Sequence, residues 1–249
     1  ICITLLIFLS FKNLLVLEYK KEGYLPSAVF NYLILLGWSP GNDQEILSKS
    51  EILEKFSIKK ISDSSAVFDS EKLDWMNGIH IRNLSTEDLS KNIIYFLEKP
   101  YKDGGLEDHI TRPIDSTKIM NIVPFIQERL KTLKDAKEMV DFFFLEDDEI
   151  QIDQNDLLSK NIDKKSISEL LMKSLKVIEE IENFKSEQLE NKFRELAKII
   201  NQKPGKLFTP IRISITGKKI APPLFETLEV LGREKSIYRI KKAIEYINQ

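Results

Sequence analysis

The sequence contains little of what disulfides and metal sites require. It has one cysteine, Cys2, and two histidines, His80 and His109, among 249 residues. A single cysteine excludes an internal disulfide and is typical of a reducing compartment. Three such side chains are too few for a usual structural zinc site, and neither histidine has a nucleophile or metal partner in the sequence. We therefore expect no bound metal, no cofactor and no catalytic residue in this chain.

Long apolar runs are also scarce. The strongest covers residues 1–11, and Lys12 and Asn13 interrupt it before the apolar residues 14–17. Such a run is too short to span a bilayer, and no basic segment or cleavage site frames it. It is interpreted as a signal or anchor remnant, as a buried strand, or as sequence unrelated to the fold that follows, and we favour the third. Because the chain begins with Ile, we expect the sequence to be incomplete at its start.

The net charge of −2 gives no global attraction to nucleic acid, but the charge is unevenly distributed. Residues 141–156 contain seven carboxylates and no Lys or Arg, whereas residues 203–249 contain ten Lys or Arg against four Glu. The first stretch is interpreted as a surface connection, with Asp147 and Asp148 as solvated side chains. The second is a basic tail that is expected to follow a phosphate backbone.

Helical periodicity of the apolar residues dominates the chain, and no β-α-β alternation or internal repeat occurs. The pattern predicts an all-α fold in two or three helical units. A turn is expected between Gly205 and Pro210, and capping boxes are expected at Ser48 and Ser85. The predicted helices begin near Pro26, after Ser48, after Asp69 and after Ser85, and then cover residues 119–144 with a break at Pro124, 166–182, 186–201, 224–231 and 233–247.

The stretch from residue 66 to 78, AVFDSEKLDWMNG, contains a complete helix with its own signals. Asp69 is a good N-cap, and Gly78 offers the left-handed residue that ends a helix. The physical pattern alone favours a capped core helix. Followed by Ile81 and Arg82, however, the stretch resembles a signature of bacterial glutamyl-tRNA synthetases, in which it lies beyond the catalytic domain.

The resemblance extends from about Leu17 to the end of the chain, in four blocks that keep the family's order. They are EYKKEGYLPSAVFNYLILLGWSPGNDQEI, AVFDSEKLDWMNGIHIR, VPFIQERLKTLKDAKEMVDFFF and PIRISITGKKIAPPLFETLEVLGREKSIYRI. The resemblance implies a helical linker region that contacts the tRNA stem, followed by a helical-bundle anticodon-binding region. We expect the boundaries to be 1–16 for the non-family apolar segment, 17–83 for the stem-contact region, and 84–162 and 163–249 for two anticodon-binding subdomains.

The two signature motifs of the family's catalytic domain do not occur in these residues. Neither a His-Ile-Gly-His-type motif nor a Lys-Met-Ser-Lys-Ser-type loop is present, and residues 60–64, KISDS, lack the second lysine. The full-length family uses ATP and Mg²⁺ to join glutamate to tRNA through an adenylate. We therefore expect this chain to be inactive alone, and a frameshift or gene join near residue 16 to explain the apolar start.

The resemblance implies tRNA contacts at particular positions. Ser39, Lys72 and Trp75 match contacts to the tRNA backbone and bend, and Arg129 matches the arginine that reads the third anticodon base. A turn serine, a core tryptophan and an ion-paired surface arginine are the structural alternatives. Ala221 departs from relatives that have a hydroxyl residue there. The remaining implied contacts are Arg212, Pro222 and Leu224 around the other two anticodon bases, and Lys218 and Lys219 at phosphates, with solvated loop lysines as the alternative.

The implied function is recognition of tRNA(Glu) through its anticodon by the C-terminal part of a glutamate–tRNA ligase. Whether tRNA(Gln) is also a partner stays open. We expect a cytoplasmic monomer that binds neither DNA nor a membrane. Two alternatives belong to other classes: a free-standing tRNA-binding module that helps a separate enzyme, and a membrane-anchored helical interaction protein that uses residues 1–17.

Overall fold

The computed structural model describes residues 16–62, 67–158 and 163–249, in which helices are connected by loops and no β-strand occurs. The all-α prediction is confirmed. Within these segments, the backbones of Trp38 and Ile61 pair in an isolated antiparallel β-bridge. The interpretation of the apolar start concerns residues 1–15, which lie outside the described segments. The chain forms two compact units, Ile1–Asp108 with Ile126–Lys137, and His109–Phe125 with Glu138–Gln249.

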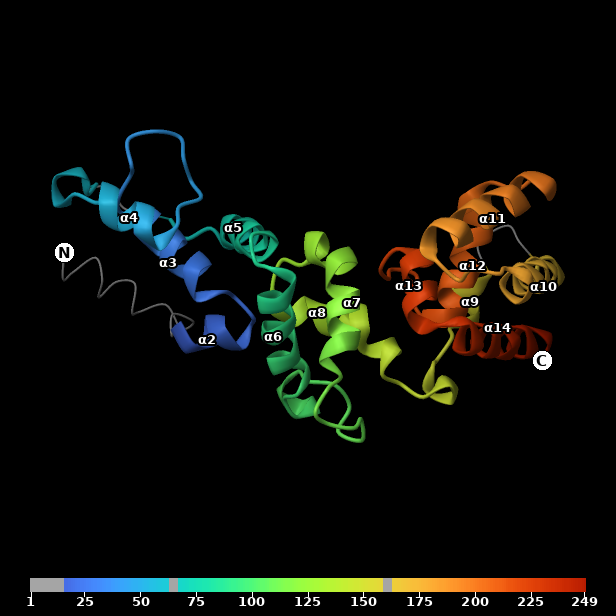
Figure 1. The fold of residues 1–249 in the computed structure, drawn as a ribbon. Helices are drawn as coiled ribbons and strands as arrows, with labels where there is room; N and C mark the ends of the chain where they lie inside the picture. The colour runs from blue at the N-terminus through green and yellow to red at the C-terminus, as the bar shows by residue number, and fades with distance from the viewer. Residues whose placement is uncertain (1–15, 63–66, 159–162) are drawn as a thin grey trace. The chain divides into compact units, whose positions relative to one another are not determined.

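The first unit is built from short helices and the loops between them (Figure 1). Its helices α3 and α5 pack against each other, and a 3₁₀ turn, η3, packs on α5. The elements are α2 (Val16–Lys21), α3 (Pro26–Leu35), α4 (Lys49–Lys55), η1 (Ile58–Lys60), α5 (Ser70–Arg82), α6 (Thr86–Leu97), η2 (Tyr101–Asp103), η3 (Gln127–Arg129) and η4 (Leu133–Asp135).

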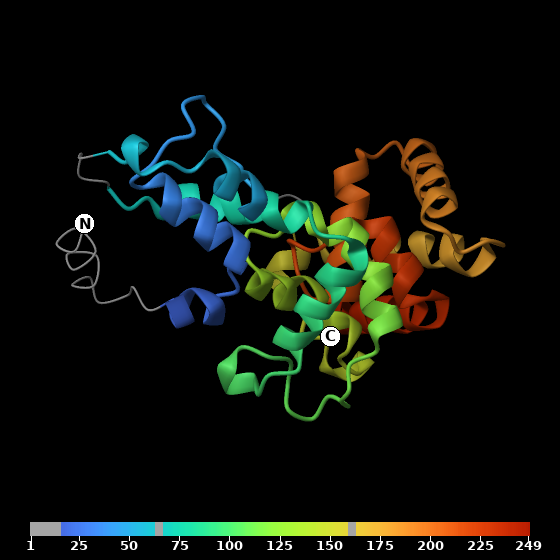
Figure 2. The same ribbon diagram turned by 60° about the vertical axis from the view of Figure 1, so that its left-hand side comes forward.

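The second unit is a bundle of longer helices, in which α14 lies against α10 and α12, and α11 lies against α13 (Figure 2). Helix α7 belongs to this unit except for its last residue, and α8 begins in the first unit and ends in the second. The elements are α7 (Ser116–Ile126), α8 (Ala136–Val140), η5 (Asp141–Phe143), η6 (Asp147–Glu149), α9 (Gln154–Leu157), α10 (Lys164–Glu180), α11 (Ser186–Ile199), α12 (Pro204–Thr216), α13 (Leu224–Leu231) and α14 (Arg233–Asn248).

Helix α5 begins where the sequence predicts and ends later. The Asp69 carboxylate accepts the backbone N–H of Lys72 at 3.0 Å, which satisfies one of the unpaired donors of the first turn. The helix continues through Gly78 to Arg82, so the prediction that Gly78 ends it is wrong. A Cβ at Gly78 would lie 3.3 Å from the carbonyl oxygen of Leu130. Gly78 therefore eases the close approach of another segment and does not form a left-handed turn.

Helix α12 also corrects a prediction, because it runs through the expected turn between Gly205 and Pro210. Pro204 occupies the first helical turn, where its missing N–H removes no hydrogen bond, and Pro210 is buried inside the helix. The helix ends at Gly217, which has φ +73°. A Cβ at Gly217 would lie 2.5 Å from the carbonyl oxygen of Gln151, so this glycine fixes the start of the following loop against the segment before α9.

The two predicted serine caps differ in detail. Ser48 forms a full capping box with Glu51, in which each side chain accepts the other residue's backbone N–H. Ser85 accepts the backbone N–H of Asp88, but its hydroxyl donates to the Asp88 carboxylate at 2.7 Å. Aspartate is one methylene shorter than glutamate, and its carboxylate here pairs with the cap side chain instead of the cap backbone.

His80 gives the first unit a pH dependence. It is half-buried in the last turn of α5, with Nε2 3.2 Å from Oδ1 of the buried Asn31. Burial lowers the pKa of His80 below its ordinary value of 6.5. Between the lowered pKa and 6.5 the unfolded chain binds more protons, so the free energy of unfolding should fall with acidification in that window and be level above it.

The measurement is urea unfolding of wild type and His80→Gln from about pH 8 to pH 5, followed by tryptophan fluorescence, because both tryptophans, Trp38 and Trp75, lie in the first unit. The difference between the two proteins should change below pH 6.5. Parallel curves over the whole range would contradict the assignment of this effect to His80.

Candidate nucleic-acid interface

The predicted contact residues fall into two groups, one in each unit. Trp75 belongs to the first group, and its exposure decides whether it is a core residue. Its side chain is 46% exposed, while Leu73 and Met76 on the same helix are buried. Helical spacing places Trp75 away from the core face of α5, so the interpretation of this residue as plain core is wrong. An exposed indole offers an apolar face to a base or ribose.

Trp75 and Arg129 line the same hollow of about 490 Å³ on the first unit. The sequence separates these residues by 54 positions, and the packing of η3 on α5 brings them together. The hollow therefore combines an indole face with a guanidinium group, which can hydrogen-bond a base edge and stack on a base plane. The other residues around it are Glu71, Asp74, Gly78, Arg82, Glu128, Leu130 and Lys131.

Gln127 attaches the Arg129 segment to the end of α5. Helix ends leave carbonyl groups without intrahelical partners. The Gln127 Nε2 lies within hydrogen-bonding distance of three carbonyl oxygens at and just beyond the end of α5, so its two N–H groups are shared among them. This single side chain thus attaches to the helix end from a distant part of the sequence. The three acceptors are the carbonyl oxygens of Ile81 at 3.0 Å, Arg82 at 3.2 Å and Leu84 at 3.0 Å.

Asn77 forms the second attachment. It is fully buried, its Nδ2 donates to the carbonyl oxygen of Lys131 at 2.5 Å, and its Oδ1 accepts the backbone N–H of Leu25 at 2.8 Å. Sequence reasoning missed both Asn77 and Gln127. The available signal was Asn77 itself, since a polar amide on the core face of an amphipathic helix is buried only when it is hydrogen-bonded.

Charges of both signs surround the hollow. Arg82 and Glu128 form a long ion pair, with 3.8 Å between Nε and Oε2. Asp74 accepts the hydroxyl of Tyr24, and burial, followed by this hydrogen bond, raises the pKa of Tyr24. The tyrosine hydroxyl therefore keeps its proton and occupies one oxygen of the Asp74 carboxylate at the edge of the hollow.

Lys72 and Ser39 have partners within the first unit. The Lys72 ammonium forms an ion pair with Glu45, and its side chain is 36% exposed. Ser39 is exposed in the loop after α3, where its hydroxyl accepts the backbone N–H of Gly41 at 3.2 Å. A phosphate would have to replace Glu45 at Lys72, whereas the Ser39 hydroxyl can still donate its proton outward.

The second group surrounds the loop between α12 and α13. Arg212 is half-buried on α12, one turn before the helix ends, whereas Pro222 and Leu224 are both buried. The side chains of Pro222 and Leu224 pack inside the second unit and support the loop between α12 and α13. Their predicted role around the anticodon stays a prediction, with Arg212 as the polar group best placed near the surface.

Both loop lysines form ion pairs within the second unit, although Lys219 also stays exposed to solvent as the alternative interpretation expects. Lys218 Nζ lies 2.6 Å from the Asp141 carboxylate and donates to the carbonyl oxygen of Glu138 at 2.7 Å. Lys219 Nζ lies 2.5 Å from Asp156. Lys219 keeps 56% of its side chain exposed and is the more accessible of the two. Phosphate binding at either lysine has to compete with a carboxylate.

These pairs are part of a broader pattern, in which the basic tail neutralises the acidic stretch. Five of its ten cations form ion pairs with residues 141–156, so a phosphate would have to compete with a carboxylate at these five, and the expectation that the tail follows a phosphate backbone stays a prediction. Opposite charges far apart in the sequence meet because α14 lies beside η6. The pairs are Lys218–Asp141, Lys219–Asp156, Lys235–Asp147, Arg239–Asp147 and Lys242–Asp148.

Arg239 is the buried centre of this pattern, with 1% of its side chain exposed. Its Nε donates to Asp147 at 2.6 Å, which corrects the interpretation of Asp147 as a solvated side chain. Its remaining N–H groups donate to three backbone carbonyl oxygens. They belong to Phe142 at 3.0 Å, Ile215 at 2.8 Å and Leu145 at 3.3 Å. The guanidinium thus joins the acidic stretch to the end of α12, just before the loop that carries Lys218 and Lys219.

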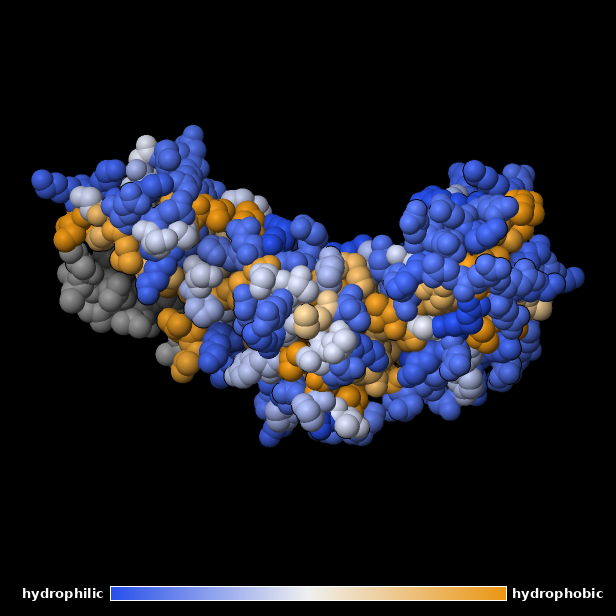
Figure 3. Space-filling view, in the orientation of Figure 1, coloured by the Kyte–Doolittle hydropathy of each residue, from blue (hydrophilic) through white to orange (hydrophobic). Residues whose placement is uncertain are grey.

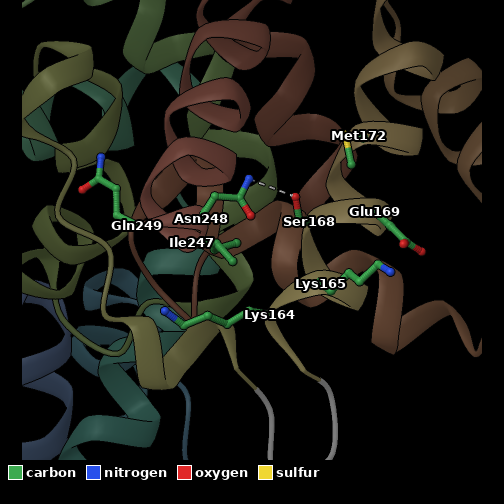
Figure 4. A pocket seen from close by; sticks show the side chains of 8 residues that line it. All are labelled: Lys164, Lys165, Ser168, Glu169, Met172, Ile247, Asn248 and Gln249. Atoms are coloured by element: carbon green, nitrogen blue, oxygen red, sulfur yellow. Dashed lines mark hydrogen bonds between the residues drawn. The ribbon is translucent and has the colours of Figure 1, made fainter.

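A separate hollow of about 380 Å³ lies where α10 begins and α14 ends. Figure 4 shows that Lys164 and Lys165, which line it, point in opposite directions, so their ammonium groups do not converge on one anion. Asn248 bridges to Ser168 at 3.4 Å. The predicted contact residues lie elsewhere.

The face of the second unit seen in Figure 3 is predominantly hydrophilic over α10 and α11.

No group of three or more His, Cys, Asp or Glu side chains is arranged to hold a metal ion within residues 16–62, 67–158 and 163–249. Over the same segments, every helix is too short or too polar to cross a bilayer.

Two family profiles match the chain. The profile of the anticodon binding domain matches residues 88–244, and that of the catalytic domain of class I tRNA synthetases (E and Q) matches residues 10–75. The second match includes most of the stretch that the resemblance placed beyond the catalytic domain, so this stretch falls at the end of the catalytic-domain profile instead. It also begins inside the segment that we expected to be unrelated to the family.

Curated relatives agree with these matches. A glutamate–tRNA ligase of Dehalococcoides mccartyi (strain CBDB1) is 38% identical over 233 residues, which cover 94% of this chain and 46% of the relative. One of Solibacter usitatus is 37% identical over 92% of this chain and 47% of the relative. The chain therefore spans about half the length of the curated relatives it matches.

A solved structure shares the fold. The crystal structure of a glutamate tRNA ligase from Elizabethkingia meningosepticum, in complex with its amino acid, superposes with a TM-score of 0.76 at 27% sequence identity, over 92% of this chain and 43% of that one. The helical fold, the matched profile and the relatives lead to one assignment. This chain belongs to the anticodon-binding domain family and corresponds to the C-terminal half of bacterial glutamate–tRNA ligases.

Proposed function

We propose that this chain binds tRNA(Glu) and recognises its anticodon. The observation that carries the proposal is the hollow in which exposed Trp75 and Arg129 lie together, with Arg129 held against α5 by Gln127 and Asn77. Binding sites that discriminate bases need such groups on a fixed support, because a mobile arginine loses entropy on binding and selects poorly.

The second group would supply contacts to the other two anticodon bases. Arg212 would act directly, while buried Pro222 and Leu224 would shape the loop and Lys219 would contact a phosphate. In this proposal residues 17–83 form the stem-contact region, and residues 84–162 and 163–249 form the two anticodon-binding subdomains. The expected setting is a monomer in the cytoplasm. The ligase activity named for the relatives would need ATP and Mg²⁺, and we assign this chain only tRNA binding.

The test is equilibrium binding of the full chain to an unmodified tRNA(Glu) transcript and to the same transcript with all three anticodon bases replaced. We expect the native anticodon to bind at least tenfold more tightly, since each well-recognised base contributes about 1–3 kcal/mol. Affinity should fall steeply with salt, because phosphate contacts release counterions. Equal affinity for the two transcripts would contradict anticodon recognition. A tRNA(Gln) transcript in the same assay decides whether that tRNA is also a partner.

A further inference from the structure

A second cationic surface lies on the first unit, outside all the predicted contact residues. Tyr95 and Tyr101 expose 55% and 54% of their surfaces there, and lysine ammonium groups lie over both rings. We call this surface the lysine–tyrosine patch. It consists of Lys20, Tyr95, Lys99, Tyr101, Lys134 and Lys137.

The tyrosine rings hold the ammonium groups in place. Lys20 Nζ lies 5.9 Å and Lys99 Nζ lies 5.3 Å from the centre of the Tyr95 ring, and Lys137 Nζ lies 4.1 Å from that of Tyr101. Lys99 Nζ lies closer still to the centre of the Phe96 ring, at 3.5 Å. A ring face attracts a cation without neutralising its charge. The lysines are therefore positioned before any anion arrives, which reduces the side-chain entropy lost on binding.

The segment that carries the patch is itself fixed. The backbone N–H of Leu106 donates to Leu97 at 2.9 Å, and Asp108 accepts the backbone N–H of Tyr101 at 2.9 Å. A Cβ at Gly105 would lie 1.8 Å from the carbonyl oxygen of Lys99, so the chain folds back on itself at a distance that only glycine allows. The turn after α6 thus presents Tyr101 and Lys99 in a defined arrangement.

Positive charge exceeds negative charge at the patch. Lys134 forms an ion pair with Glu22 at 2.8 Å, the charge of Asp103 acts on Lys99, and Asp108 lies at the backbone of Tyr101, so the four lysines of the patch face these three carboxylates. Burial is the first cause that lowers the pKa of Lys99, and the nearby charges of Lys20 and Lys134 lower it further. Mutual repulsion among these lysines is relieved when a polyanion binds.

We propose that the lysine–tyrosine patch is a second RNA-binding surface, which holds the phosphate backbone of a double helix and not its bases. Ammonium groups already lie over both tyrosine rings, so bases have little room to stack there. Ammonium and phenol groups both donate hydrogen bonds to phosphate oxygens. The inference rests on the proposed function in one respect, that the polyanion is RNA.

The probe is a loopless RNA duplex of about 20 base pairs, which has no anticodon, so this test and the anticodon test fail separately. Wild type should bind the duplex at low salt. In the variant K20Q/K137Q the slope of log K against log salt concentration should fall by about 1.8, and affinity should fall at least tenfold at about 0.1 M salt. The matched control K173Q/K176Q removes two exposed lysines from α10 and should keep the wild-type slope.

A third variant, Y95L/Y101L, keeps every charge and removes the ring faces. We expect weaker duplex binding by several-fold, because the Lys20 and Lys137 ammonium groups lose their ring contacts, whereas Lys99 keeps its contact with Phe96. Circular dichroism of each variant checks that the helices are retained. The proposal is overturned if wild type does not bind the duplex, or if both lysine pairs weaken binding equally. It is also overturned if the K20Q/K137Q effect appears with anionic phosphatidylglycerol vesicles and not with the duplex.

Discussion

Replacing Arg239 by alanine is expected to lower the free energy of unfolding of the second unit by about 3–5 kcal/mol. The substitution leaves Asp147 and the carbonyl oxygens of Phe142, Leu145 and Ile215 without their shared donor. Part of that cost arises because a carboxylate and buried carbonyl groups lose their hydrogen bonds while they stay away from water.

Native-state hydrogen exchange of amides in α12 and α14 measures this loss directly. Tryptophan fluorescence serves as an internal control, since Trp38 and Trp75 both lie in the first unit, whose unfolding should change little. The matched variant Arg194→Ala removes an exposed arginine that pairs with Glu190, and should cost less than about 1 kcal/mol. Equal effects of the two arginine variants on α14 exchange would contradict the role given to Arg239.

Replacing Arg129 by glutamine should reduce discrimination at the third anticodon base by about 1–3 kcal/mol, which corresponds to roughly 5- to 150-fold in relative affinity. Glutamine keeps a hydrogen-bonding group but loses the planar guanidinium and its charge. Binding of a tRNA that is already mismatched at that base should change much less. Arg194→Gln removes the same charge from α11 and serves as the matched control.

Local signals in the sequence predicted the local structure well. Asp69, Ser48 and Pro26 begin helices because their side chains act within one turn, so the information lies in adjacent residues. Predictions at Gly78 and Pro210 were wrong for one shared reason. In each case a residue that often ends a helix lies inside one, and Pro210 is buried there while Gly78 faces the Leu130 carbonyl group.

In the candidate site, too, the sequence indicates individual residues but not the contacts between distant segments. The resemblance named Trp75 and Arg129, but their meeting in one hollow depends on Gln127 and Asn77, whose hydrogen bonds span 43–54 residues of sequence. The sequence analysis likewise did not predict that the basic tail pairs with the acidic stretch. Composition shows how many charges of each sign there are, and only the packing of α14 beside η6 shows which of them meet.

The most direct measurement is a double-mutant cycle between Arg129 and the third anticodon base. Wild type and Arg129→Gln are each titrated with the tRNA(Glu) transcript and with a transcript changed at that base alone. The account predicts that the base change weakens wild type strongly and the variant little, which gives a coupling energy of at least about 1 kcal/mol. Additive effects, with the base change equally costly to both proteins, would contradict the claim that this chain reads the anticodon through Arg129.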